Sequence, residues 1–131
     1  MNRTLDLVLC MAIVTWITLL VASLIRAKGW TAAGFQFALG NRDKPPEATP
    51  LAGRAQRTAT NTLENFVLFA AIALVAQVAG NTDPRVVTGA EIFFWARIAY
   101  IAAYYAGIVY LRTAVWLVSI VGLGMMVNAL L

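Results

Sequence analysis

Four uncharged or nearly uncharged runs occupy most of the chain and predict membrane-spanning helices. The first, Leu7–Ile25, has 19 residues without a charge and would be about 28 Å long as an α-helix, close to the roughly 30 Å hydrocarbon core of a bilayer. The second run, 66–80, reaches that length only if it extends back through the polar residues 61–64, and two more runs cover 92–111 and 114–131. We therefore predict an all-α integral membrane protein, a single domain over residues 1–131 with a four-transmembrane-helix bundle, whose spans cover about 5–25, 58–80, 86–111 and 113–131.

The connections between these runs differ in length and charge, and they predict the topology. The first loop, about 26–50, is long and contains three prolines, whereas Asp83 and Pro84 mark a short turn in which Asp83 would cap the next helix. Lys and Arg lie mostly on one side of the predicted bundle, namely Arg26, Lys28, Arg42, Lys44, Arg54, Arg57 and Arg112 against Arg3 and Arg85. The positive-inside rule then places the first and third loops in the cytoplasm and both termini outside, in the inner membrane if the chain is bacterial.

The composition supports a membrane protein and excludes several classes of chemistry. Hydrophobic residues make up 61% and charged residues 12%, whereas a soluble domain is about half apolar and a quarter charged. The chain has no histidine and one cysteine, Cys10, which excludes a serine triad, a histidine-based metal site and an internal disulfide, so we expect no metal. Its net charge is +4, but the basic residues form no cluster interleaved with aromatics, so we expect no nucleic-acid partner.

Two stripes of polar residues fall inside the predicted spans. Arg54, Arg57, Asn61 and Glu64 are spaced by three, four and three residues, which puts them on one face of the second helix. Arg97, Tyr100 and Tyr104 share a face of the third helix in the same way. Because an unpaired buried charge is costly, we expect the stripes to face each other, with Glu64 and Arg97 as a structural ion pair. The remaining arginines then exceed the carboxylates, which indicates either a polar ligand with several carboxylates or arginines that snorkel to the membrane surface beside interfacial tyrosines.

The order and spacing of these residues resemble the MAPEG family, the membrane-associated proteins in eicosanoid and glutathione metabolism. The resemblance lies in Arg57-x-x-x-Asn61-x-x-Glu64 followed, in the next span, by Arg97-x-x-Tyr100-x-x-x-Tyr104. It extends over all four spans, and is nearest to bacterial members similar to microsomal glutathione S-transferases. It implies a homotrimer of four-helix subunits that binds glutathione, as co-substrate, between neighbouring subunits.

The resemblance also assigns roles by position. Arg112 matches the arginine that hydrogen-bonds the glutathione sulfur in catalytic members, which makes it the catalytic residue, and Arg97 keeps its structural role beside Glu64. The contact from the end of the first helix comes from Arg26 or Lys28. The residues assigned to glutathione binding are Arg26, Arg54, Arg57, Asn61, Glu64, Tyr100, Tyr104 and Thr113. Trp116 stands where some members have a tyrosine, and Thr60 where some have a basic residue.

Three classes of function remain open on the sequence. The first is a glutathione transferase or peroxidase that acts on lipophilic electrophiles at the membrane through an arginine-stabilised thiolate. The second is a non-catalytic protein of the same fold that binds glutathione or lipid. The third is a small proton-coupled exporter, which needs a titratable carboxylate within the first span. Only Asp6, at the edge of that span, offers one, which disfavours transport.

Overall fold

In a computed structural model that describes residues 2–43 and 49–131, the chain is helical throughout apart from its connections. Four long helices have the length and hydropathy to cross a membrane, and a short helix follows the first of them. The helices are α1 (Arg3–Ala27), α2 (Ala32–Leu39), α3 (Pro50–Val78), α4 (Pro84–Ala106) and α5 (Val109–Leu130). The all-α fold with four candidate spans is therefore confirmed.

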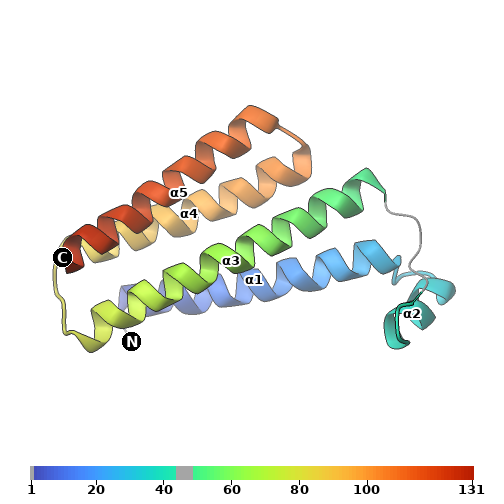
Figure 1. The fold of residues 1–131 in the computed structure, drawn as a ribbon, viewed down its shortest axis with the longest axis horizontal. Helices are drawn as coiled ribbons and strands as arrows, with labels where there is room; N and C mark the ends of the chain where they lie inside the picture. Colours follow the sequence, from blue (N-terminus) through green and yellow to red (C-terminus); the bar gives the residue numbers. More distant parts are fainter. Residues whose placement is uncertain (1, 44–48) are drawn as a thin grey trace.

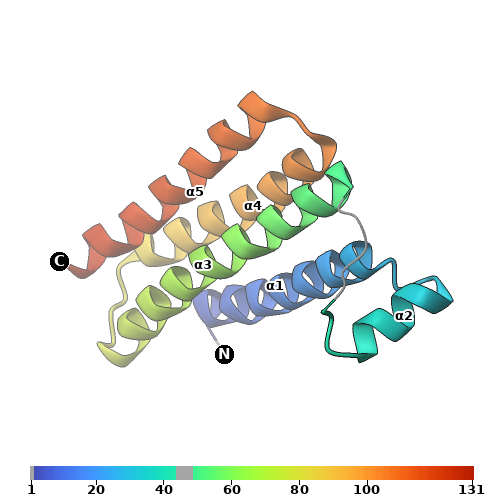
Figure 2. The same cartoon turned by 45° about the vertical axis from the view of Figure 1, so that its right-hand side comes forward.

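The four long helices lie side by side, and consecutive ones run in opposite directions (Figure 1). The interface between α4 and α5 is the most extensive, followed by that between α1 and α3, while α3 also packs against α4. Both termini lie at one end of the bundle, and α2 lies at the other end beside the end of α1 (Figures 1 and 2). Consequently α3 and α4 together form the centre of the bundle, where the two predicted polar stripes meet.

Local sequence signals explain where the helices begin. The side chains of Asn2, Thr49 and Asp83 each accept a hydrogen bond from a backbone N–H in the first turn of α1, α3 and α4, at 2.9, 3.1 and 2.9 Å. Proline follows Thr49 and Asp83, at a helical position where its missing N–H loses no bond. The Arg85 guanidinium also hydrogen-bonds the Asp83 carboxylate and holds its pKa below the ordinary range. These caps therefore mark the starts of α1, α3 and α4.

The helix bounds differ from the predicted spans in several places, and α5 begins at Val109 rather than near 113. Helix α3 begins at Pro50, eight residues before the predicted span, and Arg54 and Arg57 are helical, as the predicted polar stripe requires. Helix α4 ends at Ala106 rather than at 111, because Gly107 adopts a left-handed conformation (φ 77°) and its N–H turns back to the carbonyls of the last turn. The first loop contains α2, which the sequence analysis did not predict. Residues 44–48 of that loop, which include Lys44, lie outside the described residues.

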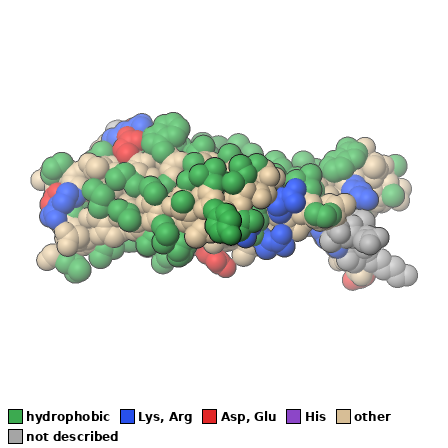
Figure 3. All heavy atoms as spheres, turned by 90° about the horizontal axis from the view of Figure 1, so that it is seen from above, with side chains coloured by type: hydrophobic (Ala, Val, Ile, Leu, Met, Phe, Trp, Pro, Cys, Tyr) green, Lys and Arg blue, Asp and Glu red, His purple; other side chains and the backbone are tan. Residues whose placement is uncertain are grey.

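The interior is built from small and aromatic residues, and the outside is apolar. Phe69 of α3 and Phe93 of α4 are fully buried and stack with their ring centroids 4.4 Å apart. Many large aliphatic side chains instead point outward, among them Leu9, Ile13 and Ile17 on α1. Hydrophobic side chains accordingly cover long stretches of the face shown in Figure 3. This is the distribution expected when lipid rather than water surrounds the helices.

Helix α2 is attached to α1 by a close contact at Gly34. A Cβ built on Gly34 would lie 2.0 Å from the carbonyl oxygen of Lys28 and 2.2 Å from that of Ala27. We therefore expect Gly34→Ala to detach α2 from α1 without unfolding the four spans. Limited proteolysis should cut this variant within residues 28–43 faster than the parent chain, while thermal unfolding of the bundle changes little. Unchanged proteolysis of the variant would contradict this packing.

Candidate functional site

Two adjoining hollows lie along α3, α4 and the start of α5, and together they form one groove. The larger hollow, of about 320 Å³, is bounded by α3 and α4, and the smaller, of about 190 Å³, reaches α5. Asn61 and Tyr100 line both hollows. We call their union the arginine–tyrosine groove; its lining residues are Gln56, Arg57, Thr60, Asn61, Glu64, Tyr100, Tyr104, Arg112, Thr113 and Trp116.

The groove exists because two helical faces meet. Arg57, Asn61 and Glu64 lie four and three residues apart on α3, and Tyr100 and Tyr104 lie four apart on α4, so each set follows one face of its helix. The faces meet because α3 packs antiparallel against α4. The left-handed turn at Gly107 then reverses the chain. As a result, α5 returns along α4 and its first turn brings Arg112 into the groove.

Tyr104 lies at the centre of the cationic part of the groove. Its hydroxyl accepts a hydrogen bond from Arg57 Nε at 2.9 Å. The guanidinium carbon of Arg112 lies 4.6 Å from the centroid of the Tyr104 ring, and that of Arg57 lies 5.9 Å from it. Within the described residues, neither arginine forms an ion pair with a carboxylate. The groove therefore presents two cationic side chains, held by one aromatic ring, to whatever occupies it.

The orientation of the Asn61 amide follows from its neighbours. Arg97 Nη2 donates to Asn61 Oδ1 at 2.7 Å, and Asn65 Nδ2 donates to the same oxygen at 3.2 Å. A guanidinium has no acceptor, so the amide must turn its oxygen toward Arg97 and keep its NH₂ group available to donate. Asn61 lines the groove, and it thus adds a third donor beside Arg57 and Arg112. A ligand rich in acceptor oxygens, such as a carboxylate, matches this set of donors.

The prediction of an ion pair between Glu64 and Arg97 is wrong, because the two side chains do not meet in the structure. Arg97 has an exposed fraction of 0%, and its guanidinium contacts neutral groups, the Asn61 and Thr62 side chains at 2.7 and 3.4 Å and the Tyr100 ring at 4.1 Å. Glu64 is exposed and lines the groove instead. Arg97 projects from α4 onto the inner face of α3, where Thr62 lies, whereas Glu64 lies on the neighbouring, outward face. Arg97 therefore contacts Asn61 and Tyr100 from the buried side of the groove.

Several of the residues singled out on the sequence lie apart from this groove or at its edge. Arg54 lines neither hollow, and its Nε is buried without a hydrogen-bond partner. Arg26 lines a separate hollow of about 180 Å³ between α1, α2 and α3, and Lys28 is exposed at the end of α1. Thr113 lines the smaller hollow and donates its hydroxyl to the Val109 carbonyl at 3.3 Å.

Three lining residues were not assigned to the site on the sequence, namely Gln56, Thr60 and Trp116. Gln56 donates to the Thr60 hydroxyl at 3.3 Å. Thr60 and Gln56 lie four and eight residues before Glu64, so the four-residue helical spacing from Glu64 was the available signal. Trp116 lines the smaller hollow one turn beyond Arg112. Its helical spacing of four residues from Arg112 was the available signal.

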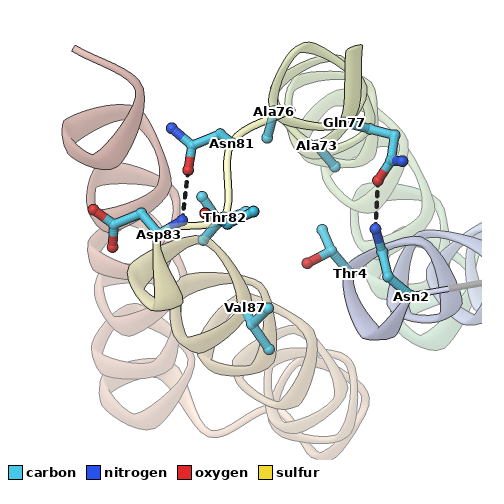
Figure 4. A pocket seen from close by; sticks show the side chains of 10 residues that line it. Asn2, Thr4, Ala73, Ala76, Gln77, Asn81, Thr82, Asp83 and Val87 are labelled. Atoms are coloured by element: carbon cyan, nitrogen blue, oxygen red, sulfur yellow. Dashed lines mark hydrogen bonds between the residues drawn. The ribbon is translucent and has the colours of Figure 1, made fainter. Parts of the chain in front are cut away.

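A further hollow, of about 200 Å³, lies at the opposite end of the bundle but lacks convergent charge. Figure 4 shows the Asn2 and Gln77 side chains hydrogen-bonded to each other and Asn81 bonded to the backbone of Asp83. The Asp83 carboxylate is paired with Arg85 at 2.7 Å. The polar groups around this hollow thus largely bind one another. The arginine–tyrosine groove is therefore the better candidate site.

The fold and the groove together define a class, a four-span membrane protein with an arginine-lined groove between α3, α4 and the start of α5. A comparison with protein families identifies the family: the MAPEG family model matches residues 5–131. The chain therefore belongs to the MAPEG family, which is consistent with a glutathione-related membrane enzyme. No curated protein matches the chain significantly.

Proposed function

We propose that the arginine–tyrosine groove binds glutathione and uses the bound thiolate to attack lipophilic electrophiles in the membrane. The observation that carries this proposal is the pair of guanidinium groups, Arg57 and Arg112, which contact one tyrosine ring and have no carboxylate partner among the described residues. Glutathione has two carboxylates and one thiol, so it offers anionic groups to both arginines. Family membership supports the same ligand.

The proposed roles divide along the groove. Arg57 and Asn61 donate to a glutathione carboxylate, and Glu64 accepts from the ligand's ammonium group. Tyr100 and Tyr104 contact the peptide portion. Arg112 lies in the smaller hollow with Thr113 and Trp116, where it would face the thiol.

The chemical task of Arg112 is to stabilise the thiolate. A free thiol has a pKa of about 8.5, so only a few per cent is ionised at neutral pH, and the thiolate is the nucleophile. Lowering that pKa to about 6.5 requires the site to favour the anion by about 2.7 kcal/mol. One or two charge-assisted hydrogen bonds from a guanidinium supply this amount in a partly desolvated groove. The thiol proton passes to solvent. The sulfur then attacks the carbon of an aryl halide, from which the halide ion leaves, or the outer oxygen of a lipid hydroperoxide, whose O–O bond breaks so that the lipid leaves as an alcohol after protonation. In the second case a second glutathione reduces the resulting glutathione sulfenic acid, which gives glutathione disulfide and water.

The second substrate would reach the sulfur from the bilayer. The start of α5 carries exposed apolar side chains, including Ile108, Val109 and Leu111, directly beside Arg112. A lipophilic molecule dissolved in the membrane would therefore meet the smaller hollow without entering water. Trp116 offers it an aromatic surface there.

Assembly into a homotrimer completes the proposal. Arg26 lines a hollow between α1, α2 and α3 rather than the groove. A contact from Arg26 to glutathione would therefore come from a neighbouring copy. Native mass spectrometry of the protein released from nanodiscs is expected to give three copies, and a monomer that still binds glutathione would overturn this part.

The experiment that tests the function is an ultraviolet difference spectrum of the purified protein with glutathione at neutral pH. We expect the absorbance of a thiolate to appear on addition of glutathione, followed by turnover of an aryl halide or a lipid hydroperoxide. Binding measured by calorimetry without thiolate absorbance would instead support the alternative, a non-catalytic protein of this family that binds glutathione or lipid. Failure to bind glutathione at all would overturn the proposal and would leave only the lipid-binding form of the alternative.

Arg57→Ala is expected to weaken glutathione binding about tenfold to a hundredfold, because a hydrogen bond to a charged group contributes about 1.5 to 3 kcal/mol. Isothermal titration calorimetry measures the effect directly. Arg85→Ala is the matched control, since Arg85 pairs with Asp83 at the other end of the bundle. Equal affinity in the two variants would remove Arg57 from the binding site.

A further inference from the structure

Helix α2 carries an apolar surface that no part of the described chain covers. Among its eight residues only Gln36 has a polar side chain. Phe35 and Leu39 nevertheless have exposed fractions of 56% and 73%, and Trp30, in the turn before α2, has 70%. We call Trp30, Phe35 and Leu39 the α2 surface. Exposing such a cluster to water is unfavourable, so the surface requires an apolar or amphipathic neighbour.

The position of α2 relative to the spans identifies that neighbour. Residues 28–31 are the only link between the end of α1 and the start of α2, and Gly34 is buried against the last carbonyls of α1. Figures 1 and 2 show α2 beside this end of α1 and on the side away from α4 and α5. Because α1 has the length to cross the membrane, α2 lies at the level where the chain leaves the bilayer. The membrane interface is therefore within reach of the α2 surface.

Basic side chains surround the same end of the molecule. Between residues 26 and 43 the cationic groups are Arg26, Lys28 and Arg42, against one acidic group, Asp43. Arg42 donates to the Ala38 carbonyl at the end of α2, which fixes its side chain beside that helix. This excess of positive charge complements an anionic headgroup.

A hollow of about 180 Å³ lies between α1, α2 and α3, and its lining changes character along α1. Arg26 and Arg42 line it together with the apolar side chains of Leu19 and Phe37. Leu19 precedes Arg26 by seven residues, about 10 Å along the helix, so the part of the lining that α1 supplies is apolar toward the middle of the span and cationic at its end. A phospholipid has the same order, with its acyl chain toward the bilayer centre and its phosphate at the interface.

We propose that α2 is an interfacial helix that binds an anionic phospholipid, in the leaflet where α1 ends. The α2 surface inserts at the boundary between headgroups and acyl chains. The lipid phosphate lies against Arg42 at the rim of the hollow, and its acyl chain follows Leu19 and Phe37. This proposal is independent of the glutathione chemistry because it uses Arg42, which lies outside the arginine–tyrosine groove, and leaves Arg26 to the proposed contact with the glutathione of a neighbouring copy.

The test uses the full chain with Trp30 as its single tryptophan, after Trp16, Trp95 and Trp116 are changed to phenylalanine. The protein is placed in nanodiscs of mixed phosphatidylglycerol and phosphatidylcholine. In one sample the phosphatidylglycerol carries bromine on its acyl chain, in the other the phosphatidylcholine does, and the quenching of Trp30 fluorescence is measured in both. We expect both brominated lipids to quench Trp30. At equal mole fraction, we expect phosphatidylglycerol to be enriched about fivefold around it, since one basic residue at a membrane surface contributes about 1 kcal/mol.

Variants of Arg42 separate headgroup binding from simple insertion. Arg42→Gln is expected to remove the preference for phosphatidylglycerol, and Arg42→Lys is expected to keep most of it. Equal quenching by the two lipids in the parent chain would overturn the anionic site. Quenching of Trp30 by aqueous acrylamide but not by brominated lipid would place α2 in water. Protection of Trp30 from both acrylamide and brominated lipid would mean that a second copy of the chain covers the α2 surface. Location of α2 in water and coverage by a second copy would each overturn the proposal. Glutathione affinity is expected to stay unchanged in Arg42→Gln.

Discussion

Arg112→Ala is expected to lower the rate of glutathione conjugation by about a hundredfold to a thousandfold, the usual cost of removing one donor that stabilises a reacting anion. The guanidinium lies 4.6 Å from the Tyr104 ring and lines the hollow in which we place the thiol. Without it the thiol would return to a pKa near 8.5 and remain mostly protonated at neutral pH. Steady-state kinetics with an aryl halide, together with the thiolate absorbance, measure this effect.

Glutathione affinity distinguishes loss of activation from loss of binding in this variant. We expect the dissociation constant to change much less than the rate in Arg112→Ala, whereas Arg57→Ala should affect affinity first. In Arg112→Ala, raising the pH through 8.5 should restore part of the rate, because the free thiol then ionises without help. Equal turnover in Arg112→Ala and the parent chain would exclude Arg112 as the group that stabilises the sulfur.

The second large effect is expected where α4 and α5 touch through two glycines. A Cβ built on Gly122 would lie 2.7 Å from the carbonyl oxygen of Gly89 and 2.8 Å from the backbone nitrogen of Phe93. Both neighbours are backbone atoms, so Gly122→Ala must push the two helices apart. Overpacking of this kind costs about 1 to 3 kcal/mol, and we expect a lower unfolding temperature in detergent. Activity should fall as well, because α5 carries Arg112 into the groove.

Gly124→Ala is the matched control for this substitution. It lies two residues away on the same helix, and a Cβ built there meets no heavy atom within 4 Å. Both changes remove the same backbone freedom, which favours the helix by about 1 kcal/mol in each case. The control should therefore be neutral or stabilising, and the difference between the two variants measures the clash alone. Similar unfolding temperatures for both variants would show that α4 and α5 are not in close contact.

The helices were predictable to the extent that hydrophobic runs reveal them. The uncharged run Leu7–Ile25 lies wholly within α1, because a span needs little more than length and apolar character. The predicted span began only near 58 because Arg54, Gln56 and Arg57 interrupt the apolar pattern before it, whereas the helix itself begins at Pro50 after the Thr49 cap. The break at Gly107 lies within an otherwise apolar run. Hydropathy carries no information about such a break, since only the backbone conformation marks it.

The candidate site was predictable as a set of residues but not as a set of contacts. Helical spacing placed Arg57, Asn61 and Glu64 on one face, and the structure joins that face to Tyr100 and Tyr104 in one hollow. The partner of Arg97 was assigned wrongly, because charge balance pointed to Glu64 whereas the packing of α4 on α3 gives it Asn61 and Thr62. Spacing along one helix cannot say which of two neighbouring faces a side chain from another helix will reach.

The sequence by itself determined a four-span helical membrane protein, two polar stripes at helical spacing and an excess of arginine over carboxylate. These properties depend on composition and on the 3.6-residue period, which are local. The tertiary structure decided which groups meet: Arg57 and Arg112 on Tyr104, Arg97 behind Asn61, and α2 beside the end of α1. These contacts depend on the approach of whole helices, which small residues such as Gly122 permit and which no single helix encodes.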